Sequence, residues 1–325
     1  MKYKACALAV AAAVATTGLS LPLQSIAQQW PEKPVRILVP FPPGGGTDIQ
    51  ARLLSTAFQK SMGQNFLIEN RTGASGLIAT QATVDSPPDG YTILFTSGSI
   101  APVTTLFAKR IKFDMHKDLQ PISLLSSTPL VLSLHPSVPV TSVKELIALA
   151  KRTKGMNVGG NTAGTTAHLA AEMFNQRFGL SSTVVTFRGA GPAVISLISG
   201  EIDYIFATAP SIMPHIRSGR AKAFAVTTKT RSSALPDLPT MDSMYPGFVS
   251  YNWYALFYSK GTPRPLVDKM NSEVKKALGT PEIKAFYPRE ALDPVGGSPE
   301  ELAVFFKDEV EKYAKVIKSA NIRVE

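Results

Sequence analysis

Residues 40–48 read P-F-P-P-G-G-G-T-D and directly follow the apolar run V-R-I-L-V at residues 35–39. The prolines end a short strand, the glycines free the backbone, and Thr47 and Asp48 are good N-caps for a helix predicted over Ile49–Lys60. A helix start carries unpaired N–H groups and the positive end of the helix dipole, which suits a carboxylate or phosphate. Taken alone, an ordinary capped strand-to-helix turn is the simpler interpretation.

Residues 1–27 have the pattern of a secretory signal peptide. Lys2 and Lys4 form a basic start, Ala5–Leu19 is apolar, and a small-x-small site ends at Ala27. Cleavage there would lower the formal charge from +10 to +8 and leave about 298 residues in the periplasm. The single cysteine, Cys6, lies inside the apolar run and away from the cleavage point, so we expect no lipid anchor, disulfide, thiol nucleophile or cysteine-ligated metal.

Composition and patterning favour two α/β domains with mainly parallel sheets, because apolar β-rich runs alternate with amphipathic helical stretches. The chain is predicted to cross between the domains through β segments near Leu125–Leu134 and Tyr251–Tyr258. Domain 1 is then predicted over residues 28–127 and 253–325, and domain 2 over residues 128–252. No run of Lys or Arg exceeds two residues, which argues against a nucleic-acid partner.

Four small, polar, glycine-containing loops follow predicted strands. They are Pro40–Asp48, Thr96–Ser99, Gly160–Thr166 and Gly189–Pro192. Ligands of open α/β sheets bind beyond the carboxyl ends of the strands, so the loops predict a cleft lined by backbone N–H groups and hydroxyls. The candidate ligand-binding residues are Phe41, Gly45, Gly46, Thr47, Asp48, Ser97, Thr162, Gly164, Thr165, Thr166, Gly189, Ala190 and Asp203.

Individual roles stay open among these residues. Gly164 precedes a helix predicted over Thr165–Phe178, and this helix start is the best candidate anion site of the second domain. Asp48 either caps its helix or binds an amine, and Asp203 either binds an amine or water or makes a structural hydrogen bond. Phe41 either packs over the ligand or belongs to the core.

Seven motifs in order resemble the substrate-binding proteins of tripartite tricarboxylate transporters, the Bug family. They cover essentially the whole mature chain and lie at residues 40–48, 63–76, 88–92, 187–193, 199–203, 235–240 and 260–263. Asn161 departs from the pattern, because a small residue such as Ser is expected there.

This resemblance implies a two-domain, periplasmic-binding-protein-like (type II) fold with the ligand cleft between its lobes. It also implies a monomer that takes up a small carboxylated solute without metal or cofactor. The partners would be the large and small integral membrane subunits of the transporter.

The alternative is a hydrolase or transferase that acts on a small carboxylate. The sequence contains no Gly-x-Ser-x-Gly elbow, no His-Glu-x-x-His and no phosphate-loop motif. His168 and Glu172 have the spacing of metal ligands on a helix, but no third ligand accompanies them, which favours a packing histidine. We therefore expect a binding protein and no enzyme.

Overall fold

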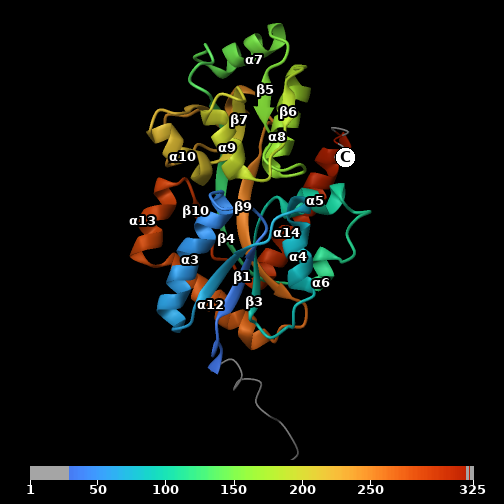
Figure 1. Cartoon of the computed structure of the whole chain (residues 1–325), viewed down its shortest axis with the longest axis vertical. Coiled ribbons are helices and arrows are strands. Elements are labelled where there is room, and N and C mark those ends of the chain that lie inside the picture. The colour runs from blue at the N-terminus through green and yellow to red at the C-terminus, as the bar shows by residue number, and fades with distance from the viewer. Residues whose placement is uncertain (1–28, 320–321, 323–325) are drawn as a thin grey trace, which may run out of the picture.

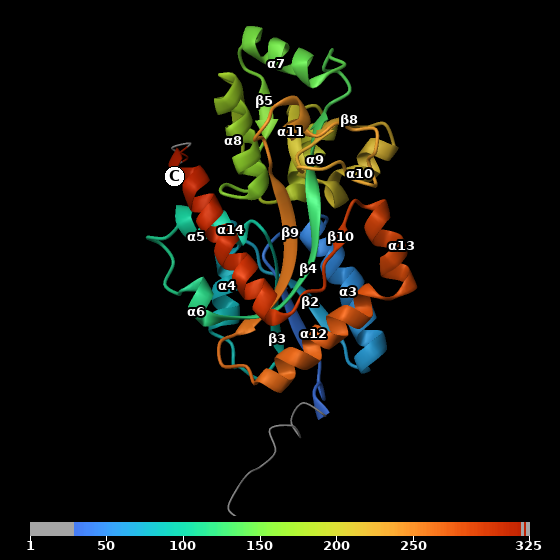
Figure 2. The same cartoon turned by 180° about the vertical axis from the view of Figure 1, so that it is seen from behind.

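The computed structural model describes residues 29–319 and 322, so the predicted signal peptide lies outside the described residues. The chain forms two lobes of helices packed on strands, and two long strands, labelled β4 and β9, run between them (Figures 1 and 2). The fold is therefore the predicted two-lobe α/β arrangement. Across the described ranges, no helix combines the length and the apolar character needed to cross a membrane.

The first lobe is built around three parallel strands, with β1 between β2 and β3. β3 is buried along its whole length, as expected for a strand covered on both faces. The elements of the first lobe are β1 (Val35–Val39), α3 (Gly46–Met62), β2 (Phe66–Asn70), η1 (Ala74–Gly76), α4 (Leu77–Val84), β3 (Thr92–Ser97), α5 (Ile100–Leu106), α6 (Met115–Asp118), α12 (Arg264–Leu278), α13 (Pro281–Arg289), β10 (Asp293–Pro294) and α14 (Pro299–Ser319).

The second lobe has a parallel group of its own, with β5 between β7 and β6. Phe174 of α8 packs against the rings of Tyr204 and Phe206 in β7, with ring centroids 5.9 and 5.4 Å away. The elements of the second lobe are α7 (Val143–Arg152), β5 (Asn157–Gly159), α8 (Thr166–Phe178), β6 (Thr183–Val185), α9 (Ala190–Ile198), β7 (Tyr204–Thr208), α10 (Ala209–Arg217), β8 (Lys222–Val226) and α11 (Met241–Met244).

The expectation of mainly parallel sheets is wrong for the strands that join the lobes. β4 (Leu119–Leu134) runs from the first lobe into the second, and β9 (Tyr251–Ser259) returns. The two strands run in opposite directions and pair antiparallel with each other. β9 also pairs antiparallel with β3, and β4 pairs antiparallel with β7 and β8. The ten strands form one mixed sheet in the order β2-β1-β3-β9-β4-β7-β5-β6, and β8 and β10 pair with β4.

The domain boundaries near residues 127 and 253 stay a prediction, and the strand register is compatible with them. Ser127 of β4 still pairs with Trp253 and Asp293, whereas Leu130 already pairs with Thr208 of the second lobe.

The helix after the glycine-rich loop begins earlier than predicted. α3 starts at Gly46, and its N-cap is Gly45, which makes no side-chain capping bond. Thr47 and Asp48 therefore lie in the first turn instead of capping it. The predicted start of α8 is confirmed, because Thr165 is its N-cap and accepts a hydrogen bond from the His168 N–H.

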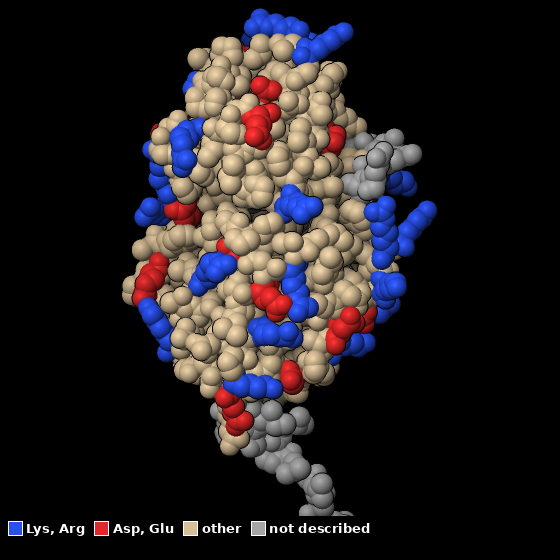
Figure 3. Space-filling model, in the orientation of Figure 1, with Lys and Arg blue, Asp and Glu red and all other residues tan. Residues whose placement is uncertain are grey.

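The lobes touch each other directly. The Ser75 hydroxyl donates to the Ala163 carbonyl at 2.7 Å, and the Gly46 N–H donates to Ser211 Oγ at 3.0 Å. On the surface, Lys and Arg are interspersed with acidic residues and form no continuous basic band on the face in Figure 3.

Candidate functional site

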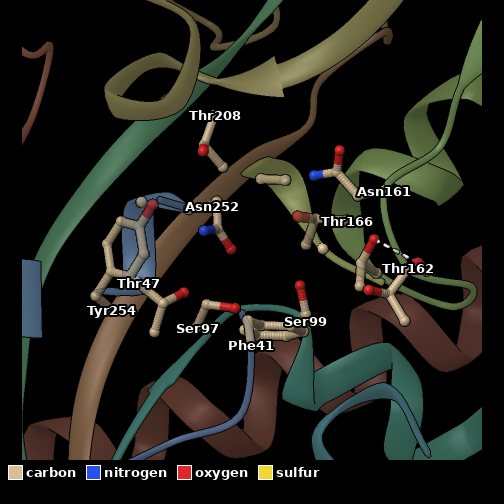
Figure 4. A pocket seen from close by; sticks show the side chains of 15 residues that line it. Phe41, Thr47, Ser97, Ser99, Asn161, Thr162, Thr166, Thr208, Asn252 and Tyr254 are labelled. Carbon is tan, nitrogen blue, oxygen red and sulfur yellow. Dashed lines mark hydrogen bonds between the residues drawn. The ribbon is translucent and has the colours of Figure 1, made fainter. Parts of the chain in front are cut away.

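A pocket lies between the two lobes, where the loops at the carboxyl ends of β1, β3, β5, β6 and β7 meet β9 (Figure 4). It encloses about 370 Å³ of space. Its lining residues are Phe41, Gly45, Gly46, Thr47, Ser97, Ser99, Asn161, Thr162, Thr165, Thr166, Gly189, Ala190, Thr208, Asn252 and Tyr254.

The first lobe supplies the glycine-rich loop and the end of β3. An added Cβ at Gly46 would collide with Tyr254 Oη and lie 3.1 Å from Thr208 Oγ1, so this position has room only for glycine. Its N–H donates to Ser211 Oγ, which in turn lies 2.8 Å from Thr208 Oγ1. The loop is thus joined to the start of α10 across the cleft.

The second lobe supplies Asn161 and the start of α8. Asn161 has a left-handed backbone conformation, with φ +48°, which asparagine tolerates better than most residues. Its carbonyl accepts the Phe187 N–H at 2.5 Å, so the backbone is fixed while the side chain lies at the pocket (Figure 4). Only 6% of Asn161 is exposed.

The strand β9 forms the back of the pocket. Asn252 and Tyr254 are two residues apart and face the pocket together, as period-two alternation along a strand requires. Trp253 faces the other way and donates to Glu309 Oε2 at 2.9 Å. Burial raises the pKa of Tyr254 to about 12, so its phenol is a neutral O–H donor at physiological pH.

Two buried side-chain oxygens in this pocket, Asn161 Oδ1 and Thr162 Oγ1, have no hydrogen-bond partner within the described part of the chain. Burying such groups without partners costs free energy, on the order of 1–3 kcal/mol each. A polar ligand that fills the pocket would remove that cost.

The electrostatics of the pocket come from helix starts, because none of its lining side chains carries a charge. The N-cap residues of five helices line it, namely Gly45 of α3, Ser99 of α5, Thr165 of α8, Gly189 of α9 and Thr208 of α10. Each helix directs the positive end of its dipole at the same space. The arrangement favours an anion.

The structure brings ten of the thirteen predicted site residues to this pocket. They are Phe41, Gly45, Gly46, Thr47, Ser97, Thr162, Thr165, Thr166, Gly189 and Ala190. The other three predicted site residues, Asp48, Gly164 and Asp203, do not line this pocket.

Asp48 is held by its own helix and strand neighbours. Its carboxylate pairs with Arg52 at 2.9 Å and accepts hydrogen bonds from Asn70 at 3.0 Å and the Gly44 N–H at 3.1 Å. Burial opposes ionisation, yet these bonds outweigh it and lower the pKa of Asp48. Its role is to fix the glycine-rich loop.

Gly164 and Asp203 face away from the pocket for different reasons. A Cβ at Gly164 would lie 3.0 Å from Leu106 Cδ1, because this residue packs on α5. Asp203 precedes β7 at the end opposite Thr208, and its Oδ2 accepts the Asn157 N–H at 2.7 Å.

Five lining residues are absent from the predicted site residues, namely Ser99, Asn161, Thr208, Asn252 and Tyr254. Ser99 and Asn161 nevertheless lie in two of the loops that were predicted to line the cleft. Thr208 ends a predicted strand just before a proline-containing helix start, so the rule that found the other loops could have found it. The sequence around Asn252 and Tyr254 contains no comparable pattern. Their side chains face the pocket only because β9 pairs with β3 and β4 in this register.

His168 is a packing residue in the structure. Its Nδ1 accepts the Gly164 N–H at 3.3 Å, and its Nε2 lies 3.7 Å from Glu172. Burial lowers its pKa to about 4, so the imidazole is neutral near pH 7. The described residues contain no group of three His, Cys, Asp or Glu side chains placed to hold a metal ion.

Comparisons with known proteins agree on one family. The profile of the tripartite tricarboxylate transporter family receptor matches residues 50–322. The protein BugT of Bordetella pertussis is 34% identical over 315 residues, which cover 96% of each chain.

Two solved structures are similar over nearly their whole length. The structure of R. palustris Rpa4515 with adipate has a TM-score of 0.86 and 32% identity, and the match covers 90% of this chain and 99% of that one. MatC (Rpa3494) from Rhodopseudomonas palustris with bound malate has a TM-score of 0.83 and 28% identity, with coverages of 89% and 100%.

Proposed function

Since the chain belongs to the tripartite tricarboxylate transporter receptor family, we propose that it captures a small carboxylated solute between its lobes for such a transporter. The observation that carries this proposal is the convergence of five helix N-caps on one uncharged pocket. Hydroxyls, amides and helix starts can hold a carboxylate without a cationic side chain.

The buried polar atoms without partners in the pocket, Asn161 Oδ1 and Thr162 Oγ1, support the same proposal, because a polar ligand could satisfy them. The similar structures named above hold adipate and malate, both of which are dicarboxylates.

Binding requires the lobes to separate and close again. The bonds from Ser75 to Ala163 and from Gly46 to Ser211 join the lobes beside the pocket. We place the hinge in β4 and β9 and retain the domain boundaries near residues 127 and 253 as part of the proposal.

The remaining parts of the proposal concern location and partners. Family membership supports a periplasmic protein that works as a monomer and docks with the large and small integral membrane subunits. We also infer that the chain binds without catalysis, so carboxylate esters offered as substrates should give no product.

The test is thermal unfolding of the purified mature chain with a panel of small carboxylates. A true ligand at a hundredfold excess over its Kd should stabilise the fold by roughly 2.7 kcal/mol. The shift should persist in EDTA, because protein groups do the binding and no metal ion is needed. Uncharged amides of the same acids are the matched controls and should give no shift. If no carboxylate stabilises the protein, the proposal fails.

A further inference from the structure

A second cavity adjoins the pocket and shares Phe41 and Thr162 with it. It contains about 720 Å³ of space, which includes open solvent, and we call it the Arg188 cavity. Its lining residues are Pro40, Phe41, Thr72, Gly73, Ala74, Ser75, Gly76, Thr162, Phe187 and Arg188. Arg188 is the only charged residue in that lining.

The backbone on both sides of Arg188 is fixed, although its side chain is exposed. The Phe187 N–H donates to the Asn161 carbonyl at 2.5 Å, and Gly189 lies against Pro42, where an added Cβ would be 2.7 Å from Pro42 Cδ. Within the described ranges, no hydrogen bond or ion pair engages the Arg188 guanidinium. The backbone thus places Arg188 at this cavity, while the hydrogen-bond donors of its side chain remain free.

The opposite wall is a left-handed turn from the first lobe. Gly73, Ala74, Ser75 and Gly76 all have positive φ, with values of 127°, 45°, 55° and 98°. Such conformations are costly for Ala74 and Ser75, and the bond from Ser75 to the Ala163 carbonyl holds the turn against the second lobe. The cavity is therefore completed only when the lobes are closed.

The acidic residues near this cavity are already paired. Glu69 lies 2.5 Å from Arg71 and 3.8 Å from Arg36, and Asp48 is paired with Arg52. Arg188 thus faces a space with no compensating carboxylate in its walls. Thr162 adds a buried hydroxyl oxygen without a partner at the boundary between the two spaces.

We propose that the Arg188 cavity is a second anion subsite, which takes the distal carboxylate of an elongated dicarboxylate whose first carboxylate lies in the uncharged pocket. This inference rests on the proposed function and deepens it, because it names the substrate class. A guanidinium can bind a carboxylate through two parallel hydrogen bonds, and Arg188 has the free donors to do so.

The test compares acids of equal chain length by calorimetry, with adipate and hexanoate as the probes. The parent should bind adipate at least tenfold more tightly than hexanoate. Arg188→Gln should lower adipate affinity at least tenfold and change hexanoate affinity less than twofold. Arg188→Lys should recover part of the adipate affinity, because it restores the charge without the bidentate geometry.

Arg71→Gln is the matched control. It removes one positive charge beside Thr72, but from a side chain already paired with Glu69, so adipate affinity should stay within twofold of the parent. An unchanged melting temperature in all three variants would show that they fold.

Two outcomes would overturn the inference. Equal binding of adipate and hexanoate by the parent, or equal losses for both acids in Arg188→Gln, would remove the second subsite and leave carboxylate capture standing. Failure of every carboxylate to bind would remove the proposed function and this inference with it.

Discussion

At the scale of single residues, Asn161 is the most informative position. It departs from the small residue expected there, it lies in a left-handed conformation, and its buried Oδ1 has no partner among the residues that the structure describes. A neutral amide in this place can accept or donate a hydrogen bond, but it cannot repel an anion.

Asn161→Asp should therefore weaken carboxylate binding without unfolding the protein. Aspartate has nearly the same shape and tolerates positive φ, but it places a negative charge against the ligand. We expect at least a tenfold loss of affinity by calorimetry, which corresponds to about 1.4 kcal/mol. Asn161→Ser, which stays neutral, should lose less. Equal affinities for the Asp variant and the parent would show that this side chain does not face the ligand.

Gly164 illustrates how a sequence prediction can name a residue for the wrong reason. Its φ is +79°, and an added Cβ would press on Leu106 of α5 and on its C-cap residue Phe107, in the other lobe, at 3.0 and 3.3 Å. The residue governs how closely the lobes approach and makes no wall of the pocket.

Gly164→Ala should lower both stability and ligand affinity. Gly179, with φ +63° and open space around its α-carbon, is the matched control for backbone strain alone. In urea titrations Gly179→Ala should lose about 1 kcal/mol through backbone strain, and Gly164→Ala should lose more, because its Cβ also presses on Leu106. Only the Gly164 variant should also bind more weakly, because closure is impeded. Unchanged affinity in that variant would argue against the closed arrangement of the lobes.

At the scale of elements, the sequence predicted the loops well and their partners less well. Strand ends followed by glycine and hydroxyl residues located three of the five helix starts at the pocket, because this pattern reflects local backbone chemistry. Thr208 followed the same pattern but lacked glycines, so it went unnoticed.

The interior of α8 gives a prediction about pH. The folded-state pKa of His168 is about 4, below its ordinary value of 6.5, because burial penalises the charged form. Between these values the unfolded chain binds more protons, so stability must fall as the pH falls through this window. Glu172, which lies 3.7 Å away, has its pKa raised by burial and partly offsets the effect.

We expect the free energy of unfolding to drop by up to about 2 kcal/mol between pH 7 and pH 5 because of His168. His168→Gln keeps a neutral side chain and should flatten this part of the pH profile in urea titrations. A profile as steep as that of the parent would show that other groups set the acid sensitivity.

At the scale of the whole molecule, the two-lobe fold was predictable, but the back wall of the pocket was not. The alternation of strands and helices and the two crossing segments indicated the lobes. Asn252 and Tyr254 reach the pocket only because β9 pairs with β3 and β4 in one register, and such nonlocal pairing leaves no local mark in a sequence.

Closure of the lobes is also a property of the whole chain. Arg217 at the end of α10 pairs with the buried Glu290 after α13 at 2.8 Å, on contacts separate from those at the pocket. Together with the bonds from Ser75 and Gly46, this pair defines the closed state in which a solute would be held.

The central claim is that the closed pocket holds a small carboxylate, and native mass spectrometry of the protein purified without denaturation tests it most directly. The account predicts a mass above that of the mature chain by one small organic acid, which is released on denaturation and identified as a carboxylate. A neutral or cationic small molecule in its place, or the bare chain together with no binding of any added carboxylate, would contradict it.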